Sequence, residues 1–321
     1  MKTMKPIVAA VLLLAALFAK QASGQMMKET DLTLKTATGE IFGTLMLPEK
    51  PTDIPVVLII AGSGPTDRDC NSSMGIKTNA YKMLAECLAG QGIASLRYDK
   101  RGIAQSKAAM TAEADLRFET YINDAVDWLK MLKADKRFNK LIVLGHSEGS
   151  LIGMVATSQA EASAFISLSG AGEAADIILK KQLKDKLPPA LLEESDRILE
   201  SLKAGKTDDQ VSPSLNTLYR PSVQPYMISW MKYDPAKEIA KLKVPALIVQ
   251  GTTDLQVTVE DAKLLSGAKP DAKLVIVENM NHVLKESGPD LQENMGTYTN
   301  PELPLKKELG DEVTNFVKLL K

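Results

Sequence analysis

Short apolar runs alternate with longer amphipathic segments along most of the 321-residue chain. The runs are rich in β-branched side chains, which is typical of strands buried on both faces of a sheet. They lie at residues 56–60, 93–98, 141–144, 164–168, 245–249 and 274–277. The segments between them, such as 80–89 and 118–133, repeat apolar residues about every 3.6 positions. Because parallel strands need crossover connections, this alternation predicts an α/β fold with a mostly parallel central sheet and helices on both faces.

Three further segments depart from this alternation. Residues 31–36 and 41–47 alternate apolar and polar positions on either side of a turn-like stretch, which predicts an antiparallel hairpin. The interval from about 172 to 243 is long, charged, helix-prone and interrupted by prolines. We expect it to form a helical cap inserted into the main domain, because it has enough apolar side chains to pack; a solvated linker is the alternative. Residues 304–320 predict a closing amphipathic helix.

The N-terminus has the pattern of a secretory signal peptide. Two lysines precede an apolar run at residues 7–19, and small residues follow at 22–24. An uncleaved anchor is the competing interpretation, but this run is shorter than the ~20 apolar residues that span a bilayer as a helix. We therefore expect residues 1–24 to be removed and residues 25–321 to form one secreted or periplasmic domain with no stable membrane anchor.

Composition excludes several classes of protein. Apolar residues make up 45% and charged residues 25% of the chain, as is ordinary for a globular domain. Removing the signal peptide changes the formal charge from −1 to −4, since it carries three lysines and no acids. A mildly acidic protein without a basic patch is not expected to bind nucleic acid. The sequence contains two cysteines, Cys70 and Cys87, and two histidines, so we expect neither a zinc site nor a disulfide framework.

The segment Gly145-His146-Ser147-Glu148-Gly149 follows one apolar run and precedes a helix-compatible stretch. This order of strand, turn and helix is what a G-x-S-x-G nucleophile elbow requires. Glycines at both ends let the backbone bend sharply enough to expose the serine hydroxyl. Ser147 is therefore the candidate nucleophile, with an ordinary glycine-flanked turn as the alternative.

A serine nucleophile needs a base, and histidine has the most suitable pKa. His146 adjoins Ser147 within the turn, where its side chain should point away, so His282 is the candidate base. Asp254 follows the 245–249 run and completes the order Ser, Asp, His. It would orient the imidazole and stabilise its charged form; a turn or helix N-cap is the alternative role. The weaker carboxylate candidates are Glu260, Asp261 and Glu278.

A tetrahedral oxyanion needs two preorganised donors. We assign one to the backbone amide of Glu148, directly after the nucleophile. The other is assigned to the amide of Ser63, in the glycine-containing loop 61–65 that follows the 56–60 run. A phosphate-binding loop is not expected there, because no Gly-Lys-Ser/Thr sequence follows.

These motifs together resemble those of the α/β-hydrolase family, from about residue 28 to the end of the chain. The matching stretches are residues 62–69, 97–102, 145–149, 251–254 and 281–282. The first two are similar to those of bacterial carboxylesterases, which implies a serine esterase that works through an acyl-enzyme and needs no cofactor. The chain lacks the His-Gly-Gly-Gly run of many lipases. Residues 97–102 would shape the loop beside the site or form a salt-bridged structural turn.

We therefore expect a hydrolase that acts on a small-molecule ester. In the cap, Tyr226, Met227 and Trp230 are candidates to line an apolar acyl pocket, although such a cluster is also typical of plain core. Thioesterase and aminopeptidase-like activities are the alternatives among hydrolases. A catalytically silent binding module on the same fold is the alternative outside enzymes, because a fold alone does not establish a function.

Overall fold

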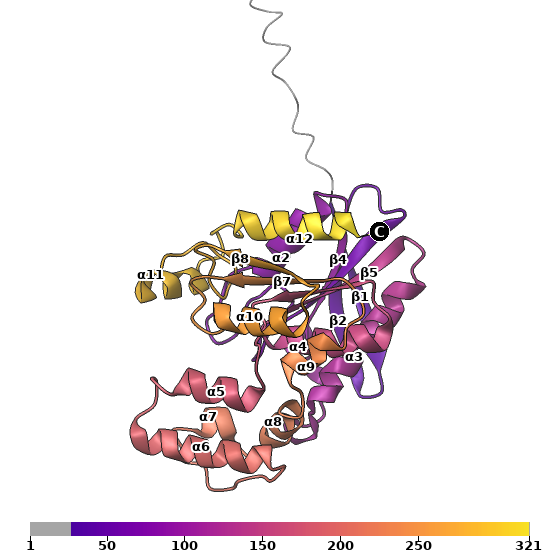
Figure 1. The fold of residues 1–321 in the computed structure, drawn as a ribbon. Coiled ribbons are helices and arrows are strands. Elements are labelled where there is room, and N and C mark those ends of the chain that lie inside the picture. The colour runs from indigo at the N-terminus through magenta and orange to yellow at the C-terminus, as the bar shows by residue number, and fades with distance from the viewer. Residues whose placement is uncertain (1–26, 321) are drawn as a thin grey trace, which may run out of the picture.

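The computed structural model describes residues 27–320, so the predicted signal peptide lies outside the described residues. An eight-stranded sheet forms the centre of the molecule, in the order β1-β2-β4-β3-β5-β6-β7-β8 (Figure 1). The strands are β1 (Lys28–Thr36), β2 (Gly39–Leu47), β3 (Ile54–Ile60), β4 (Ala94–Tyr98), β5 (Phe138–His146), β6 (Ala164–Leu168), β7 (Ala246–Gly251) and β8 (Lys273–Val277).

Strand directions agree with the sequence pattern. β1 and β2 form the predicted antiparallel hairpin, and β2 also runs antiparallel to β4. From β4 to β8, every neighbouring pair is parallel, which confirms the mostly parallel sheet. The chain leaves β3 toward β4 on one side and returns to β5 on the other side of β3. The carboxyl ends of β3 and β5 therefore meet at the switch point where open α/β sheets form their ligand sites.

Helices cover both faces of the sheet (Figure 1). One face packs against α2 (Ala80–Ala89) and α12 (Lys307–Leu319), and the other against α3 (Phe118–Ala134), α4 (Glu148–Ala160), α9 (Pro235–Ala240) and α10 (Val259–Ala268). Successive residues of β3 show why its sequence is apolar throughout. Val57 and Ile59 pack on the face covered by α2 and α12. Val56 and Leu58 pack on the opposite face, which is covered by α3, α4, α9 and α10. Side chains alternate between faces along a strand, so two covered faces require a continuous apolar run.

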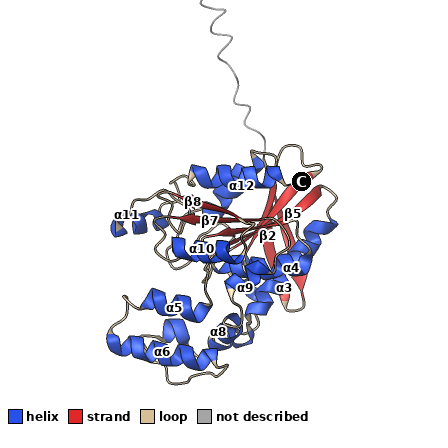
Figure 2. Cartoon of the chain, viewed as in Figure 1, coloured by secondary structure: helices blue, strands red, loops and turns tan. Residues whose placement is uncertain are grey.

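A separate group of helices lies beside the body that contains the sheet (Figure 2). These helices come between β6 and β7 in the chain. The group contains α5 (Ala175–Leu183), α6 (Pro189–Lys203), α7 (Asn216–Tyr219) and α8 (Gln224–Trp230), and we call these four helices the cap. The cap has its own apolar cluster, which includes Ile198, Leu202 and Tyr219. α9 lies in the same sequence interval but packs against α4 and α10 of the main body. The cap helices thus fold around their own core beside the sheet.

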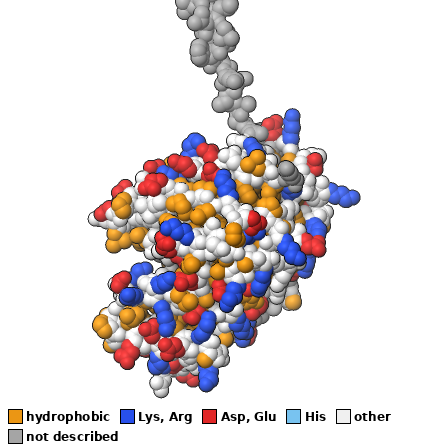
Figure 3. Space-filling view, viewed as in Figure 1, with side chains coloured by type: hydrophobic (Ala, Val, Ile, Leu, Met, Phe, Trp, Pro, Cys, Tyr) orange, Lys and Arg blue, Asp and Glu red, His pale blue; other side chains and the backbone are white. Residues whose placement is uncertain are grey.

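The remaining short helices are α11 (Leu291–Gly296) and the 3₁₀ turns Ala104–Ala109, Glu113–Asp115 and Thr297–Thr299. Within residues 27–320, no helix combines the length and the apolar character needed to cross a bilayer. On the face drawn in Figure 3, basic and acidic side chains are interspersed among hydrophobic ones. This mixed surface is typical of a globular domain.

Candidate active site

Ser147 occupies a sharp turn between β5 and α4. Its φ of 55° and ψ of −123° lie in a region that non-glycine residues rarely adopt. Two backbone hydrogen bonds hold this conformation: the Ser147 amide donates to the carbonyl of Leu168, and its carbonyl accepts from the amide of Ser150, each at 2.9 Å. Such strain persists only where the surrounding structure enforces it, and it is common at functional sites.

The two glycines of the elbow are required by close backbone packing. A Cβ atom on Gly145 would lie 2.1 Å from the carbonyl oxygen of Gly149. A Cβ atom on Gly149 would lie 2.3 Å from the carbonyl oxygen of Ile60 and 2.6 Å from that of Ala61. Real Cβ atoms do not come this close to backbone. The start of α4 therefore lies directly against the end of β3, which brings the loop after β3 next to Ser147.

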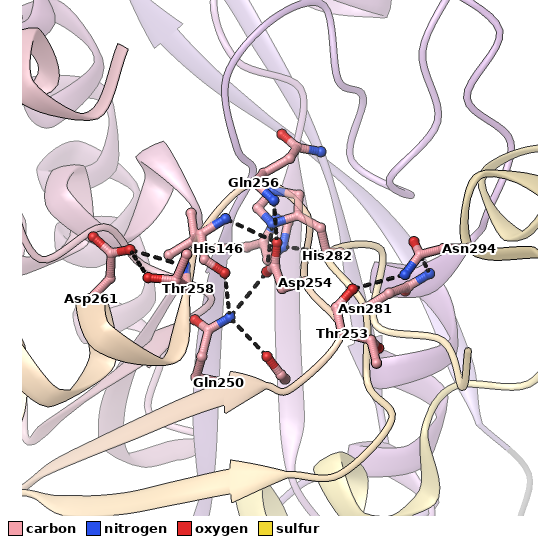
Figure 4. A network of polar contacts seen from close by, with 12 residues as sticks. His146, Gln250, Thr253, Asp254, Gln256, Thr258, Asp261, Asn281, His282 and Asn294 are labelled. Atoms are coloured by element: carbon pink, nitrogen blue, oxygen red, sulfur yellow. Dashed lines mark hydrogen bonds and ion pairs between the residues drawn. The ribbon is translucent and has the colours of Figure 1, made fainter. Parts of the chain in front are cut away.

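Asp254 and His282 lie on the loops that follow β7 and β8, and the structure brings them together. The Nδ1 atom of His282 is 2.8 Å from the Oδ2 atom of Asp254 (Figure 4). Nδ1 carries the proton in this contact, because an ionised carboxylate only accepts. His282 Nε2 is therefore left as the basic nitrogen. His282 and Ser147 line the same small cavity of about 70 Å³.

Several donors keep the Asp254 carboxylate ionised although its side chain is fully buried. Burial alone would raise its pKa, but the facing His282 lowers the pKa below its ordinary value. The amides of Val257 and Gln256 add to this by donating to Oδ1 at 3.0 and 2.8 Å. Gln250 Nε2 donates to Oδ2 at 3.1 Å. A buried anion with this many donors is suited to stabilise an imidazolium opposite it.

The alternative carboxylates have other surroundings. Asp261 accepts from the backbone amide of Thr258 in a capping box at the start of α10. Glu260 forms an exposed ion pair with Lys263, and Glu278 is exposed. The helix N-cap is Thr258 and not Asp254, so Asp254 is free to contact the histidine.

His146 has a different role from His282. Its Nδ1 atom lies 2.7 Å from the Tyr81 hydroxyl, and its Nε2 atom lies 2.9 Å from the carbonyl oxygen of His282. Since a carbonyl only accepts, Nε2 carries the proton and Nδ1 accepts from Tyr81. Burial, followed by the nearby His282, lowers the pKa of His146 to about 3. His146 is therefore a neutral support: it fixes the backbone of the base, and through Tyr81, which accepts from the Gly62 amide at 3.3 Å, it also holds the loop after β3.

Asn294 of α11 links the two loops that carry the acid and the base. Its side-chain amide donates to the carbonyl of Thr253 at 2.8 Å, and its Oδ1 accepts from the side chain of Asn281 at 3.2 Å (Figure 4). Thr253 precedes Asp254, and Asn281 precedes His282. Asn294 belongs to no periodic pattern or motif in the sequence, so the sequence does not predict its contribution.

The proposed oxyanion donors lie on two segments that line the same cavity as Ser147. Ser63 follows β3 and Glu148 opens α4, and both line a cavity of about 430 Å³ together with Ser147. Neither amide has a hydrogen-bond partner among residues 27–320. Because the first amides of a helix lack intrahelical acceptors, the Glu148 amide is free to bind an anion. Both donors are thus available at the cavity that contains the nucleophile.

The larger cavity lies between the cap and the body. The three side chains predicted for the acyl pocket, Tyr226, Met227 and Trp230, all line it. They also pack into apolar clusters, so the alternative role as core holds in part. Other lining residues, which the sequence analysis does not single out for the pocket, include Leu151, Ile178, Leu179 and Val223. Within residues 27–320, no cluster of three or more His, Cys, Asp or Glu side chains is arranged to hold a metal.

The segment 97–102 forms ion pairs with four different parts of the chain. Its pairs are Arg97 with Glu29 and Asp69, Asp99 with Arg68, Lys100 with Glu148, and Arg101 with Asp124. Of these, the Lys100 pair reaches a residue of the candidate active site.

Gly149→Ala is expected to lower kcat/KM for any substrate by about 100-fold or more, since a displacement of about 1 Å at an active site has an effect of this size. The added methyl group would force α4 away from Ile60 and the loop that holds Ser63. Gly153→Ala, in the same helix, is the matched control, because its Cβ would meet only side-chain atoms at 3.0 Å or more. Equal activity of the two variants would contradict the packing argument.

In His146→Gln, the free energy of unfolding is expected to fall less steeply with decreasing pH than in the wild-type protein. The unfolded chain binds a proton at this histidine below its ordinary pKa of 6.5, whereas the folded chain does so only near 3. The stabilising contribution is therefore complete above pH 6.5 and is lost as pH falls toward 3, by on the order of 4 kcal/mol. Urea unfolding from pH 3.5 to 7.5 measures it. A wild-type slope no steeper than that of the variant would show that His146 is not buried in its neutral form.

Comparisons with known proteins identify the family and the fold of the chain. Residues 73–286, more than half of the chain, match the family model described as serine aminopeptidase, S33. The chain is 28% identical over 290 residues to esterase EstD of Thermotoga maritima. This match covers 84% of the chain but spans only 66% of the length of that relative, just under two thirds.

Solved structures share the fold at low identity. Est1E of Butyrivibrio proteoclasticus, solved with ferulic acid bound, has a TM-score of 0.59 at 18% identity, and the match covers 89% of this chain and 96% of that one. The α/β hydrolase GrgF of Penicillium has a TM-score of 0.60 at 17% identity, with coverage of 91% and 99%. The chain therefore has the α/β-hydrolase fold and belongs to the S33 serine aminopeptidase family of hydrolases.

Proposed function

We propose that this protein is a serine hydrolase that cleaves carboxylic esters through an acyl-enzyme. The observation that carries the proposal is the 2.8 Å contact between His282 and the buried Asp254 beside the strained Ser147. The relative EstD is named an esterase, which supports the same class of substrate.

The proposed reaction follows from these positions. His282 Nε2 removes the proton of Ser147 as Oγ attacks the ester carbonyl carbon. The amides of Ser63 and Glu148 donate to the resulting oxyanion. The imidazolium, stabilised by ionised Asp254, then protonates the leaving alkoxide as the carbonyl–alkoxide bond breaks. Water repeats the sequence on the acyl-enzyme with His282 as the base, and this releases the acid and the free serine.

Placement of the acyl group follows from the same proton transfer. The leaving oxygen must be next to His282, which lines the small cavity and not the large one. We therefore place the acyl group in the 430 Å³ cavity against Tyr226, Met227 and Trp230, and the first atoms of the alcohol in the 70 Å³ cavity. The first of these cavities suits an apolar acyl group.

Aminopeptidase activity is the second candidate, because the family takes its name from it. An aminopeptidase needs an available carboxylate to bind the substrate's ammonium group. The acidic side chains that line the large cavity are Glu148 and Glu173, and each already forms an ion pair, with Lys100 and Lys181 respectively. This pairing favours an uncharged ester over an aminoacyl substrate. A thioester would fit the same geometry.

The test compares p-nitrophenyl esters of increasing acyl length, the matching thioesters and aminoacyl p-nitroanilides on the purified protein. We expect the esters to have the highest kcat/KM, and Ser147→Ala to lower kcat by at least about 10³-fold. Ser150→Ala is the matched control, since its hydroxyl lies in α4, three residues after Ser147, and contacts the Ser167 hydroxyl at 2.8 Å. Preferred anilide turnover would overturn the ester assignment. Full activity of Ser147→Ala, or no activity of the wild-type protein on any of these substrates, would overturn the proposal of a serine hydrolase.

We further propose that the protein is exported and acts in the periplasm or outside the cell. The support is the pattern of residues 1–24, two lysines, an apolar run and small residues. Expression of the full chain in a bacterium, followed by N-terminal sequencing of the exported fraction, should give a mature N-terminus near Gln25. A chain that keeps residues 1–24 and stays in the cytoplasm would contradict export.

A further inference from the structure

Lys100 is a buried lysine at the carboxyl end of β4. Its side chain is 2% exposed. Removing an ammonium group from water is costly unless it is paired, so its partners show what it stabilises. Its Nζ atom lies 2.8 Å from Glu148 Oε2, donates to the carbonyl of Gly62 at 2.7 Å and sits 4.8 Å from the centre of the Tyr121 ring.

Two of these partners adjoin the oxyanion donors. Glu148 is itself the residue whose amide is one donor, and Gly62 directly precedes Ser63, whose amide is the other. The two donors lie on segments that are 85 positions apart in the sequence. A single ammonium group therefore links the backbone of the loop after β3 to the first residue of α4.

The Glu148 side chain is also linked to the cap. Its second carboxylate oxygen accepts a hydrogen bond from the Tyr226 hydroxyl, and the carboxylate is 4% exposed. Burial, with the Glu148 charge, raises the pKa of Tyr226 well above its ordinary value, so the phenol keeps its proton and remains the donor. Tyr226 belongs to α8 and lines the large cavity.

Charge balance gives this network a consequence for catalysis. An ionised carboxylate on the residue that donates to the oxyanion would oppose the negative charge that develops there. Lys100 cancels that charge at contact distance. Without the lysine, the chain would carry a buried anion next to the site that must bind an anion.

We propose that Lys100, Glu148 and Tyr226 form a positioning network that sets the spacing and the charge of the oxyanion hole and connects it to the cap. This network proposal rests on the proposed function, because the oxyanion forms in the proposed ester hydrolysis. Lys100 acts through Glu148 and Gly62 and is a positioning residue, since it does not line either cavity.

The test measures two quantities on Lys100→Met, Glu148→Gln, the double variant and Tyr226→Phe. The first is kcat and KM for the best ester, normalised to the folded fraction. The second is the rate at which a fluorophosphonate labels Ser147, which needs the oxyanion hole but no knowledge of the substrate. Lys269→Met is the matched control, because Lys269 is also a buried lysine, bonded to the Leu242 carbonyl and Asp271 at the end of α10.

We expect Lys100→Met to lower kcat and the labelling rate by about 10- to 100-fold with KM changed less than threefold. The double variant lacks both charges of the pair, so its kcat and its labelling rate should be at least fivefold higher than those of Lys100→Met. Tyr226→Phe should lower kcat by a smaller factor, and Lys269→Met should leave both rates within twofold.

Equal labelling of wild-type protein and Lys100→Met would overturn the network while leaving the proposed function intact. A double variant no faster than Lys100→Met would overturn the charge-balance argument. If Lys100→Met does not fold, the double variant and Tyr226→Phe decide the question, and wild-type rates in both would overturn the network. Absence of labelling in the wild-type protein would instead contradict the proposed function.

Discussion

The close contact between the start of α4 and the end of β3 is the constraint on which the rest of the site depends. Gly149 lies so near the carbonyls of Ile60 and Ala61 that no side chain fits between them. This contact holds Ser147 in its strained conformation and places the loop with Ser63 beside it. Because it is made of backbone atoms at the start of α4 and at the end of β3, the same contact positions the nucleophile and the loop that carries one oxyanion donor.

The acid and the base are held by a second, independent set of contacts. They lie on separate loops, after β7 and after β8. His146 and Asn294 tie these loops in place: the first binds the backbone of His282 from the elbow, and the second bridges the residues that precede Asp254 and His282. Both supports are buried, and the pKa of His146, lowered to about 3, keeps its side chain uncharged at neutral pH.

Much of this arrangement could be predicted from the sequence, because the signals are local. Continuous apolar runs specify strands covered on both faces, and G-x-S-x-G specifies the turn at Ser147. The chain has two histidines, and His146 adjoins Ser147 within the turn, so His282 is the candidate base. The supports were not predictable in the same way: Asn294 and Tyr81 act through contacts between distant segments and carry no periodic signal. Lys100 belongs to a charged segment of the sequence, but its pairing with Glu148 becomes evident only when the fold brings the loop after β4 to the start of α4.

The most direct test of the account is a crystal structure of the protein after reaction with a fluorophosphonate. We predict a covalent phosphoryl group on Ser147 Oγ, with one of its oxygens within hydrogen-bond distance of both the Ser63 and Glu148 amides. We also predict that His282 Nε2 faces the bridging oxygen while Nδ1 keeps its contact with Asp254. An unmodified Ser147, or an adduct whose oxygens point away from both amides, would contradict the claim that these residues form the catalytic site of a serine hydrolase.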